Sequence, residues 1–133
     1  MKYICLGYHD EARWESMSRS EQERFIDECF AYDDWLRENG HFTGGEALES
    51  ARNAVTVRYQ NGKSSVTDGP FAETKEQLGG ILILEARDFN HAIQLMSNHP
   101  GVRLGSSFEI RPTVDMTEMI DQSRERRSAT KRS

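Results

Sequence analysis

The sequence has few cysteines and no recognisable set of metal ligands. Cys5 and Cys29 stand far apart in a chain of 133 residues, with no CxxC spacing and no second pair. This spacing argues against a disulfide scaffold and against a cysteine zinc site, and no two of the four histidines have metal-ligand spacing. We therefore expect two buried free thiols in a reducing compartment, and we predict neither a metal nor a cofactor.

Long apolar runs and an excess of positive charge are also missing. The apolar run at residues 1–6 is too short for a secretory signal and predicts a first strand, and no segment approaches the roughly 20 apolar residues of a membrane span. The formal net charge of −5 argues against general nucleic-acid binding, which needs a basic face. These absences favour a cytoplasmic protein without a membrane anchor.

The familiar catalytic patterns are absent as well. The sequence contains no identifiable Ser/His/Asp or Cys/His arrangement. The glycine pairs at 44–45 and 79–80 lack the flanking residues of a phosphate loop. The sequence therefore leaves open whether the protein is an enzyme.

The first half of the chain contains one strongly patterned helix. Ser18 and Glu21 form a capping box, Phe25 and the apolar residues after it recur at helical spacing, and Gly40 suits a left-handed cap. We expect strands at 2–8 and within 41–50, and a loop with apolar anchors at 9–17.

The second half begins with a hairpin signal. Asn61-Gly62 joins an alternating strand at 55–59 to a returning arm at 64–67. We then expect about two helical turns at 73–78. The remaining predicted elements are a central strand at 81–86, a helix from Asp88 to Pro100, a strand at 107–111, and a basic tail with a short helix at 116–120 that is otherwise irregular.

This order, β-α-β, hairpin, β-α-β, predicts one α+β domain. Its two helices would pack on one face of a largely antiparallel sheet. Because no third helix is predicted within the ordered region, we expect a second copy of the chain to cover the opposite face. The predicted division is a folded domain at 1–112 and a polar basic tail at 113–133.

A family resemblance rests on the run Thr67–Gly80, which includes Asp68-Gly69-Pro70-Phe71. The opening Met1-Lys2-Tyr3, the segment 45–48 and the ending 109–112 agree with it. The chain resembles the DGPF branch of the YCII-related proteins. The resemblance implies a ferredoxin-like subunit of a dimeric α+β barrel.

The resemblance also bears on function in two ways. Related YCII proteins have been proposed to be enzymes that use a His/Asp pair, and members of the DGPF branch are often associated with sigma factors. The YCII pattern would place an aspartate just before the proline that follows the second helix. This sequence has His99 before Pro100, and the first long helix has no histidine. We therefore do not transfer the pair.

The candidate site residues gather around the Asp-Gly-Pro-Phe segment. Asp68 is the candidate catalytic carboxylate, acting as a base or a hydrogen-bond acceptor, although it can equally accept backbone bonds that shape the turn. Glu73 and Lys75 can form ion pairs at the surface instead of binding a ligand. Arg58 can likewise point outward from its strand instead of into a pocket. The candidate ligand-binding residues are Tyr8, His9, Arg58, Gly69, Pro70, Phe71, Glu73, Lys75 and His99.

Two functions follow from these candidates. The first is small-molecule binding in a pocket near the Asp-Gly-Pro-Phe segment, with or without catalysis. The alternative is a non-catalytic regulatory or interaction module, associated with a sigma factor or another transcription component. In that case the dimer surface or the basic tail would contact the partner, and a purely structural role for the segment also stays open.

Overall fold

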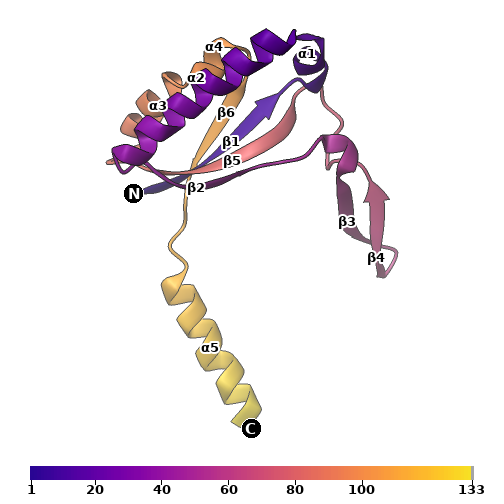
Figure 1. The fold of residues 1–133 in the computed structure, drawn as a ribbon. Coiled ribbons are helices and arrows are strands. Elements are labelled where there is room, and N and C mark those ends of the chain that lie inside the picture. Colours follow the sequence, from indigo (N-terminus) through magenta and orange to yellow (C-terminus); the bar gives the residue numbers. More distant parts are fainter. Residues whose placement is uncertain (133) are drawn as a thin grey trace.

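The protein is a four-stranded antiparallel sheet with helices on one face and a separate hairpin (Figure 1). The computed structural model describes residues 1–132, and the strand order is β2-β5-β1-β6. The strands are β1 (Lys2–His9), β2 (Phe42–Ala47), β3 (Val55–Gln60), β4 (Lys63–Asp68), β5 (Gln77–Glu85) and β6 (Ser107–Pro112). The helices are α1 (Glu11–Ser16), α2 (Arg19–Glu38), the 3-10 turn η1 (Ala51–Asn53), α3 (Phe89–Ser97), α4 (Pro100–Arg103) and α5 (Thr117–Arg132). The predicted ferredoxin-like α+β architecture is confirmed.

The two strongest local signals of the sequence hold in the structure. Ser18 Oγ accepts a hydrogen bond from the Glu21 backbone N–H, and the Glu21 carboxylate accepts one from the Ser18 N–H, at 3.2 and 3.4 Å. Asn61 and Gly62 join β3 to β4 with φ values of 53° and 78°, as a turn with left-handed central residues requires.

The loop predicted at 9–17 is wrong, because the structure has helix α1 there. Asp10 Oδ1 accepts hydrogen bonds from the N–H groups of Ala12 and Arg13, which caps the helix. The Trp14 ring meets Phe25 edge-on at 5.5 Å, so the apolar anchor of the predicted loop is part of a helix. A single turn and a half is too short to show helical periodicity in its sequence.

The helix predicted at 73–78 is also wrong. Residues 71–76 form bends, and Gln77 and Leu78 already belong to β5, where they pair with His9 and Tyr8. The Gln77 side chain donates to the Thr74 carbonyl at 2.7 Å, which satisfies backbone without a helix. Gln77 and Leu78 have side chains that favour a helix, but they lie in a strand because they pair with β1.

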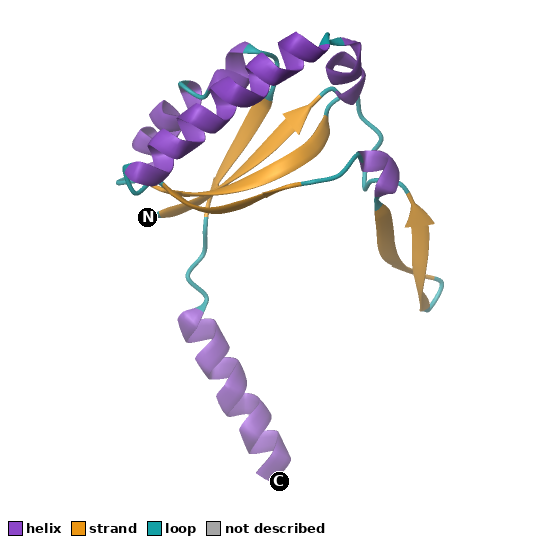
Figure 2. Cartoon of the chain, in the orientation of Figure 1, coloured by secondary structure: helices purple, strands orange, loops and turns teal. Residues whose placement is uncertain are grey.

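The end of the chain is more helical than expected. The short helix predicted at 116–120 is part of α5, which continues through Arg132 and projects away from the sheet (Figures 1 and 2). No helix within residues 1–132 is long and apolar enough to cross a membrane.

The hydrophobic core fills the space between the sheet and its helices. Alternate residues of β1 and β5 face the helices, so Tyr3, Cys5 and Leu84 are almost fully buried. The core consists of Tyr3, Cys5, Leu36, Leu82, Leu84, Ala86, Ala92, Leu95 and Met96. Both cysteines are free and buried, as predicted.

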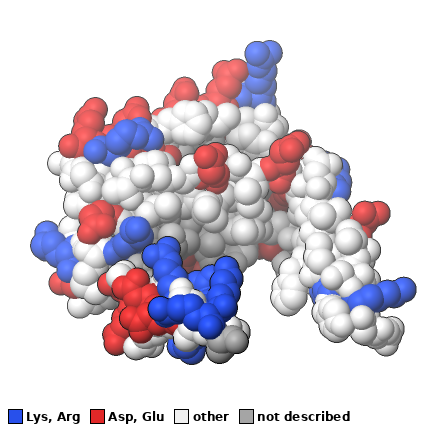
Figure 3. Space-filling view, turned by 90° about the horizontal axis from the view of Figure 1, so that it is seen from below, with Lys and Arg blue, Asp and Glu red and all other residues white. Residues whose placement is uncertain are grey.

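The opposite face of the sheet has no helix over it (Figure 1). Residues paired across neighbouring strands share a face, and Ile4 pairs with Ile83 while Leu6 pairs with Ile81. We call these four half-buried residues the aliphatic stripe. Seen from below, the surface between α5 and the hairpin is largely uncharged (Figure 3).

Candidate active site

A cavity of about 520 Å³ lies on the helix side of the sheet. Glycines occupy several strand positions of its floor, and at each of them an added Cβ would crowd a neighbouring atom. At Gly7, for example, a Cβ would lie 3.1 Å from the Phe108 ring. The glycines of this floor are Gly7, Gly45, Gly79 and Gly80. The walls come from α2, the strand ends and α4.

An aspartate and a histidine meet at this cavity. Asp33 projects from α2, and His99 directly precedes Pro100 at the start of α4. The His99 Nε2 and Asp33 Oδ1 atoms are 3.0 Å apart. The His99 side chain is 6% exposed and that of Asp33 is 23% exposed, so the carboxylate is the member of the pair nearer to solvent.

The hydrogen bonds of His99 fix its protonation. The Gly101 backbone N–H donates to His99 Nδ1 at 3.0 Å, so Nδ1 carries no proton. The Nε2–H must then be the donor to Asp33. His99 is therefore a neutral imidazole with both nitrogens in use, so neither nitrogen is free to hydrogen-bond a ligand.

Asp33 keeps one oxygen for the cavity. No other hydrogen bond reaches the Asp33 carboxylate within residues 1–132, so its Oδ2 is open to a ligand. The rings of Tyr32 and Phe108 pack against His99 at centroid distances of 5.3 and 5.0 Å, and the Tyr32 hydroxyl donates to the Leu95 carbonyl at 2.5 Å. A fixed carboxylate with one free oxygen can act as a base or as a hydrogen-bond acceptor.

The two cysteines at the cavity are poor nucleophiles. Burial raises the pKa of the Cys5 thiol to about 12. Burial, reinforced by the negative charge of Asp33, raises that of Cys29 to about 11. Because the thiolate is the reactive form, neither thiol supports nucleophilic catalysis at neutral pH.

The structure brings three of the predicted site residues to this cavity: Tyr8, His9 and His99. A second cavity of about 790 Å³ lies beside the hairpin, where Pro70 and Phe71 join Tyr8 in the lining. Tyr8 is thus common to both cavities, and the sequence-predicted residues are divided between them.

Asp68 lies apart from both cavities. It is exposed at the end of β4, opposite Val55 in the hairpin, and lines neither space. Gly69 after it has a φ of 104° and donates its N–H to the Ala54 carbonyl at 2.8 Å, which closes the base of the hairpin. The geometry gives this segment a turn-forming role, and a catalytic role for Asp68 stays a prediction.

The remaining candidates lie near the hairpin. Arg58 donates to the Phe71 carbonyl at 3.2 Å, and its guanidinium stands 5.4 Å from the centre of the Phe71 ring. Lys75 lines a shallow space with Tyr8, and Glu73 is exposed. These residues do not contact the Asp33–His99 pair.

Sequence reasoning missed Asp33. The expected pattern has a histidine on the first long helix and an aspartate before the proline. This chain has the two residue types exchanged, with Asp33 on α2 and His99 before Pro100, so a search that allows either residue at either position finds the pair. Within the described residues, no group of three or more His, Cys, Asp or Glu side chains is arranged to hold a metal.

The fold and this site together define a ferredoxin-like α+β subunit with an Asp/His pair at a helix-side cavity. The model of the YCII-related domain matches residues 1–117, and the chain belongs to the YCII-related family. The finer placement in the DGPF branch stays a prediction.

One protein is similar to this chain in sequence, and one solved structure is similar in fold. An uncharacterised protein of Rhizobium meliloti (strain 1021) is 32% identical over 113 residues, which are 84% of this chain and 91% of that protein. The solved structure of 5-chloro-2-hydroxyhydroquinone dehydrochlorinase from Burkholderia phenoliruptrix AC1100, in complex with 2,5-dihydroxybenzoquinone, is similar in fold. Its TM-score is 0.54 and its identity 13%, with 86% of this chain and 94% of that chain covered.

Proposed function

We propose that this protein binds a small molecule in the helix-side cavity and transfers a proton with Asp33 as the base. The hydrogen bond between Asp33 and a locked, neutral His99 is the observation that carries the proposal. A carboxylate that is held in place needs little reorganisation when it accepts a proton. His99 acts as a positioning residue, because its nitrogens face Asp33 and Gly101 rather than the cavity.

The cavity suits a small ligand with a planar, apolar body. Its volume lies within the range of small-molecule sites, and aromatic side chains from α2, β2 and β6 line it. The structurally similar dehydrochlorinase was solved with a dihydroxybenzoquinone, which is likewise small and planar, although more polar. The sequence-based proposal of a pocket beside the Asp-Gly-Pro-Phe segment stays a second candidate, because Pro70 and Phe71 line the cavity beside the hairpin.

The proposal can be tested with 2,5-dihydroxybenzoquinone as a probe in D2O. Proton NMR would follow both binding of the probe and exchange of its ring protons for deuterium. We expect the wild-type protein to accelerate exchange, and Asp33→Asn to bind the probe without accelerating exchange. Asp27→Asn is the matched control, since Asp27 is an exposed residue of the same helix and lines no part of the cavity.

Two results would contradict the proposal. If the probe causes no change in the protein spectrum at residues of the cavity, this site does not bind it. If Asp33→Asn accelerates exchange as well as the wild type does, Asp33 is not the base.

We further propose that the protein is a homodimer in which the aliphatic stripes of two copies face each other. The stripe crosses the centre of a sheet face that no helix within residues 1–132 covers. The hairpin and α5 project on the same side and carry further exposed apolar residues, including Val57, Tyr59 and Met119. Contiguous apolar surface of this kind is typical of an interface. A sigma-factor or other transcription partner stays a prediction from the sequence.

A further inference from the structure

A smaller cavity of about 240 Å³ lies beside the main one at the end of β1. His9, Phe25 and Ser106 line both spaces, so a ligand in the main cavity can reach the smaller one. The smaller cavity is otherwise lined by Asp10, Arg13, Trp14, Met17, Leu104 and Gly105. It combines an apolar wall with two side chains that can carry positive charge.

The first of these is His9, whose position depends on Gly79. Gly7 pairs with Gly80 and Tyr8 with Leu78, so Gly79 is the unpaired residue of a β-bulge. A Cβ at Gly79 would overlap the His9 imidazole. The φ angle of Gly79 is not positive, so glycine is needed here for space and not for backbone conformation. The His9 ring thus rests on bare backbone. Neither of its nitrogens has a hydrogen-bond partner in the part of the chain that the structure describes.

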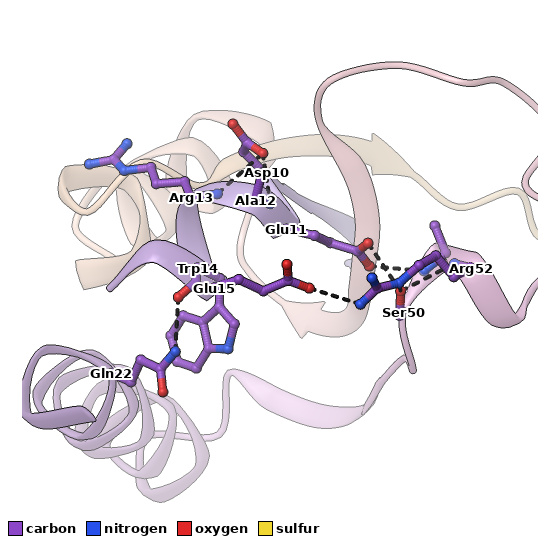
Figure 4. Close-up of polar contacts among 10 residues, drawn as sticks. Asp10, Glu11, Ala12, Arg13, Trp14, Glu15, Gln22, Ser50 and Arg52 are labelled. Atoms are coloured by element: carbon purple, nitrogen blue, oxygen red, sulfur yellow. Dashed lines mark hydrogen bonds and ion pairs between the residues drawn. The ribbon is translucent and has the colours of Figure 1, made fainter. Parts of the chain in front are cut away.

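The second is Arg13, which lies against Gly105. A Cβ at Gly105 would overlap the Arg13 guanidinium. Figure 4 shows the Arg13 side chain extending away from the contacts that join Glu11 and Glu15 to Ser50 and Arg52. Among residues 1–132, no carboxylate lies within ion-pair distance of this guanidinium. Glu11 and Glu15, the nearest acids in sequence, bond to Ser50 and Arg52, and Asp10, which lines the same cavity, has its Oδ1 bound to backbone N–H groups of α1.

We propose that Arg13 and His9 bind the carboxylate of a small acid whose apolar body extends into the main cavity toward Asp33. A guanidinium holds a carboxylate through two parallel hydrogen bonds, and an imidazole can donate a third. The proposal rests on the proposed function of the main cavity and adds its substrate class, which is a small carboxylic acid with a planar body. The acidic group is held at one end, so that the reacting proton of the body lies at the Asp33 end.

The test compares benzoate with benzamide, which has the same shape without the charge. Calorimetric titration would give both dissociation constants for the wild type and for Arg13→Gln, Arg13→Lys and Arg103→Gln. Arg103 is the control because it is an exposed arginine that lines neither cavity. We expect the wild type to prefer benzoate by about tenfold, since a charge-assisted hydrogen-bond pair is stronger than a neutral one.

The variants separate the proposed carboxylate site from general attraction of anions. Arg13→Gln should reduce the preference for benzoate to less than about twofold, and Arg103→Gln should leave it unchanged. Arg13→Lys should retain part of it, because lysine keeps the charge and loses the planar fork. Gly79→Ala should also weaken benzoate binding by displacing His9, without altering any charge.

The remaining outcomes overturn the inference. If benzoate and benzamide bind the wild type equally, the cavity accepts small molecules and the carboxylate site is wrong. If Arg103→Gln weakens benzoate as much as Arg13→Gln does, the preference is a surface effect. If neither compound binds while 2,5-dihydroxybenzoquinone does, the carboxylate site is wrong and the small-molecule function of the main cavity stands; if none of the three binds, both proposals fail.

Discussion

The two faces of the sheet are built from alternate residues of the same strands, yet the helices cover only one of them. On the helix side, Tyr3, Cys5 and Leu84 are buried and His99 has both nitrogens bonded. On the other side, Ile4 and Ile83 remain half-buried with no helix over them. The difference underlies both proposals, a ligand site on the helix side and a dimer interface on the open side.

The segment that identifies the family also differs from the residues that we propose carry out the chemistry. The Asp-Gly-Pro-Phe segment is the most distinctive part of the sequence, and it forms the base of a hairpin that projects on the open side. Asp33 and His99 carry no distinctive motif, and the fold brings them together from positions far apart in the chain. Turn geometry demands particular residues in sequence order, whereas a site assembled by packing does not.

The largest effect should come from placing a charge on the open face. Ile83→Asp would put a carboxylate at the centre of the proposed dimer interface, where burial of an unpaired charge costs several kcal/mol. We expect the dissociation constant to rise at least about 1000-fold. Light scattering should then give a mass near the 15.3 kDa of one chain instead of twice that value. A wild-type protein that is already monomeric would refute the dimer.

The next effect concerns the helix side. His99→Ala removes a buried ring, the cap of α4 and the partner of Asp33, and should lower the free energy of unfolding by about 3 kcal/mol. Asp68→Ala on the hairpin is the comparison and should change it by less than about 0.5 kcal/mol. Urea unfolding measures both. Equal losses would mean that the two regions contribute alike to stability.

Thiol reactivity tests the burial of the same face. With pKa values of about 11 and 12, Cys29 and Cys5 hold little thiolate near neutral pH. Their reaction with a disulfide reagent at about pH 8 should be roughly 100-fold slower in the native protein than in urea. Native rates within tenfold of the unfolded ones would show that the cavity opens readily.

The smallest effect should appear at the hairpin tether. Glu11 accepts a hydrogen bond from the Ala51 N–H at 2.9 Å, which is the main cause of its lowered pKa and fastens α1 to η1 (Figure 4). Stability from a lowered carboxyl pKa is present above the unfolded value of about 4.5 and is lost as pH falls through the folded pKa.

The melting temperature should therefore fall slightly less for Glu11→Gln than for the wild type between about pH 6 and about pH 3. Glu15→Gln serves as the control, because Glu15 pairs with Arg52 at the same place. An identical fall in Glu11→Gln and the wild type would exclude the tether from the acid response.

The sequence predicted most of the fold because strong local signals mark its elements. The capping box at Ser18 and the turn at Asn61-Gly62 require particular residues, and both occur where expected. The prediction failed at α1 and at residues 73–78, where tertiary contacts decide between short alternatives. Of the candidate site residues, Tyr8, His9 and His99 line the helix-side cavity, whereas Asp33 was not a candidate because its contact with His99 forms only across the fold.

The single open oxygen of Asp33 has a stereochemical consequence. One oxygen is held by His99, and the helix α2 fixes the direction from which the other approaches the cavity. A planar substrate lying in the cavity would present the same side to that oxygen in every turnover. At a CH2 group attached to that planar body, proton removal would then be specific to one of the two prochiral hydrogens, and a deuterium label there would be retained or lost completely according to its configuration.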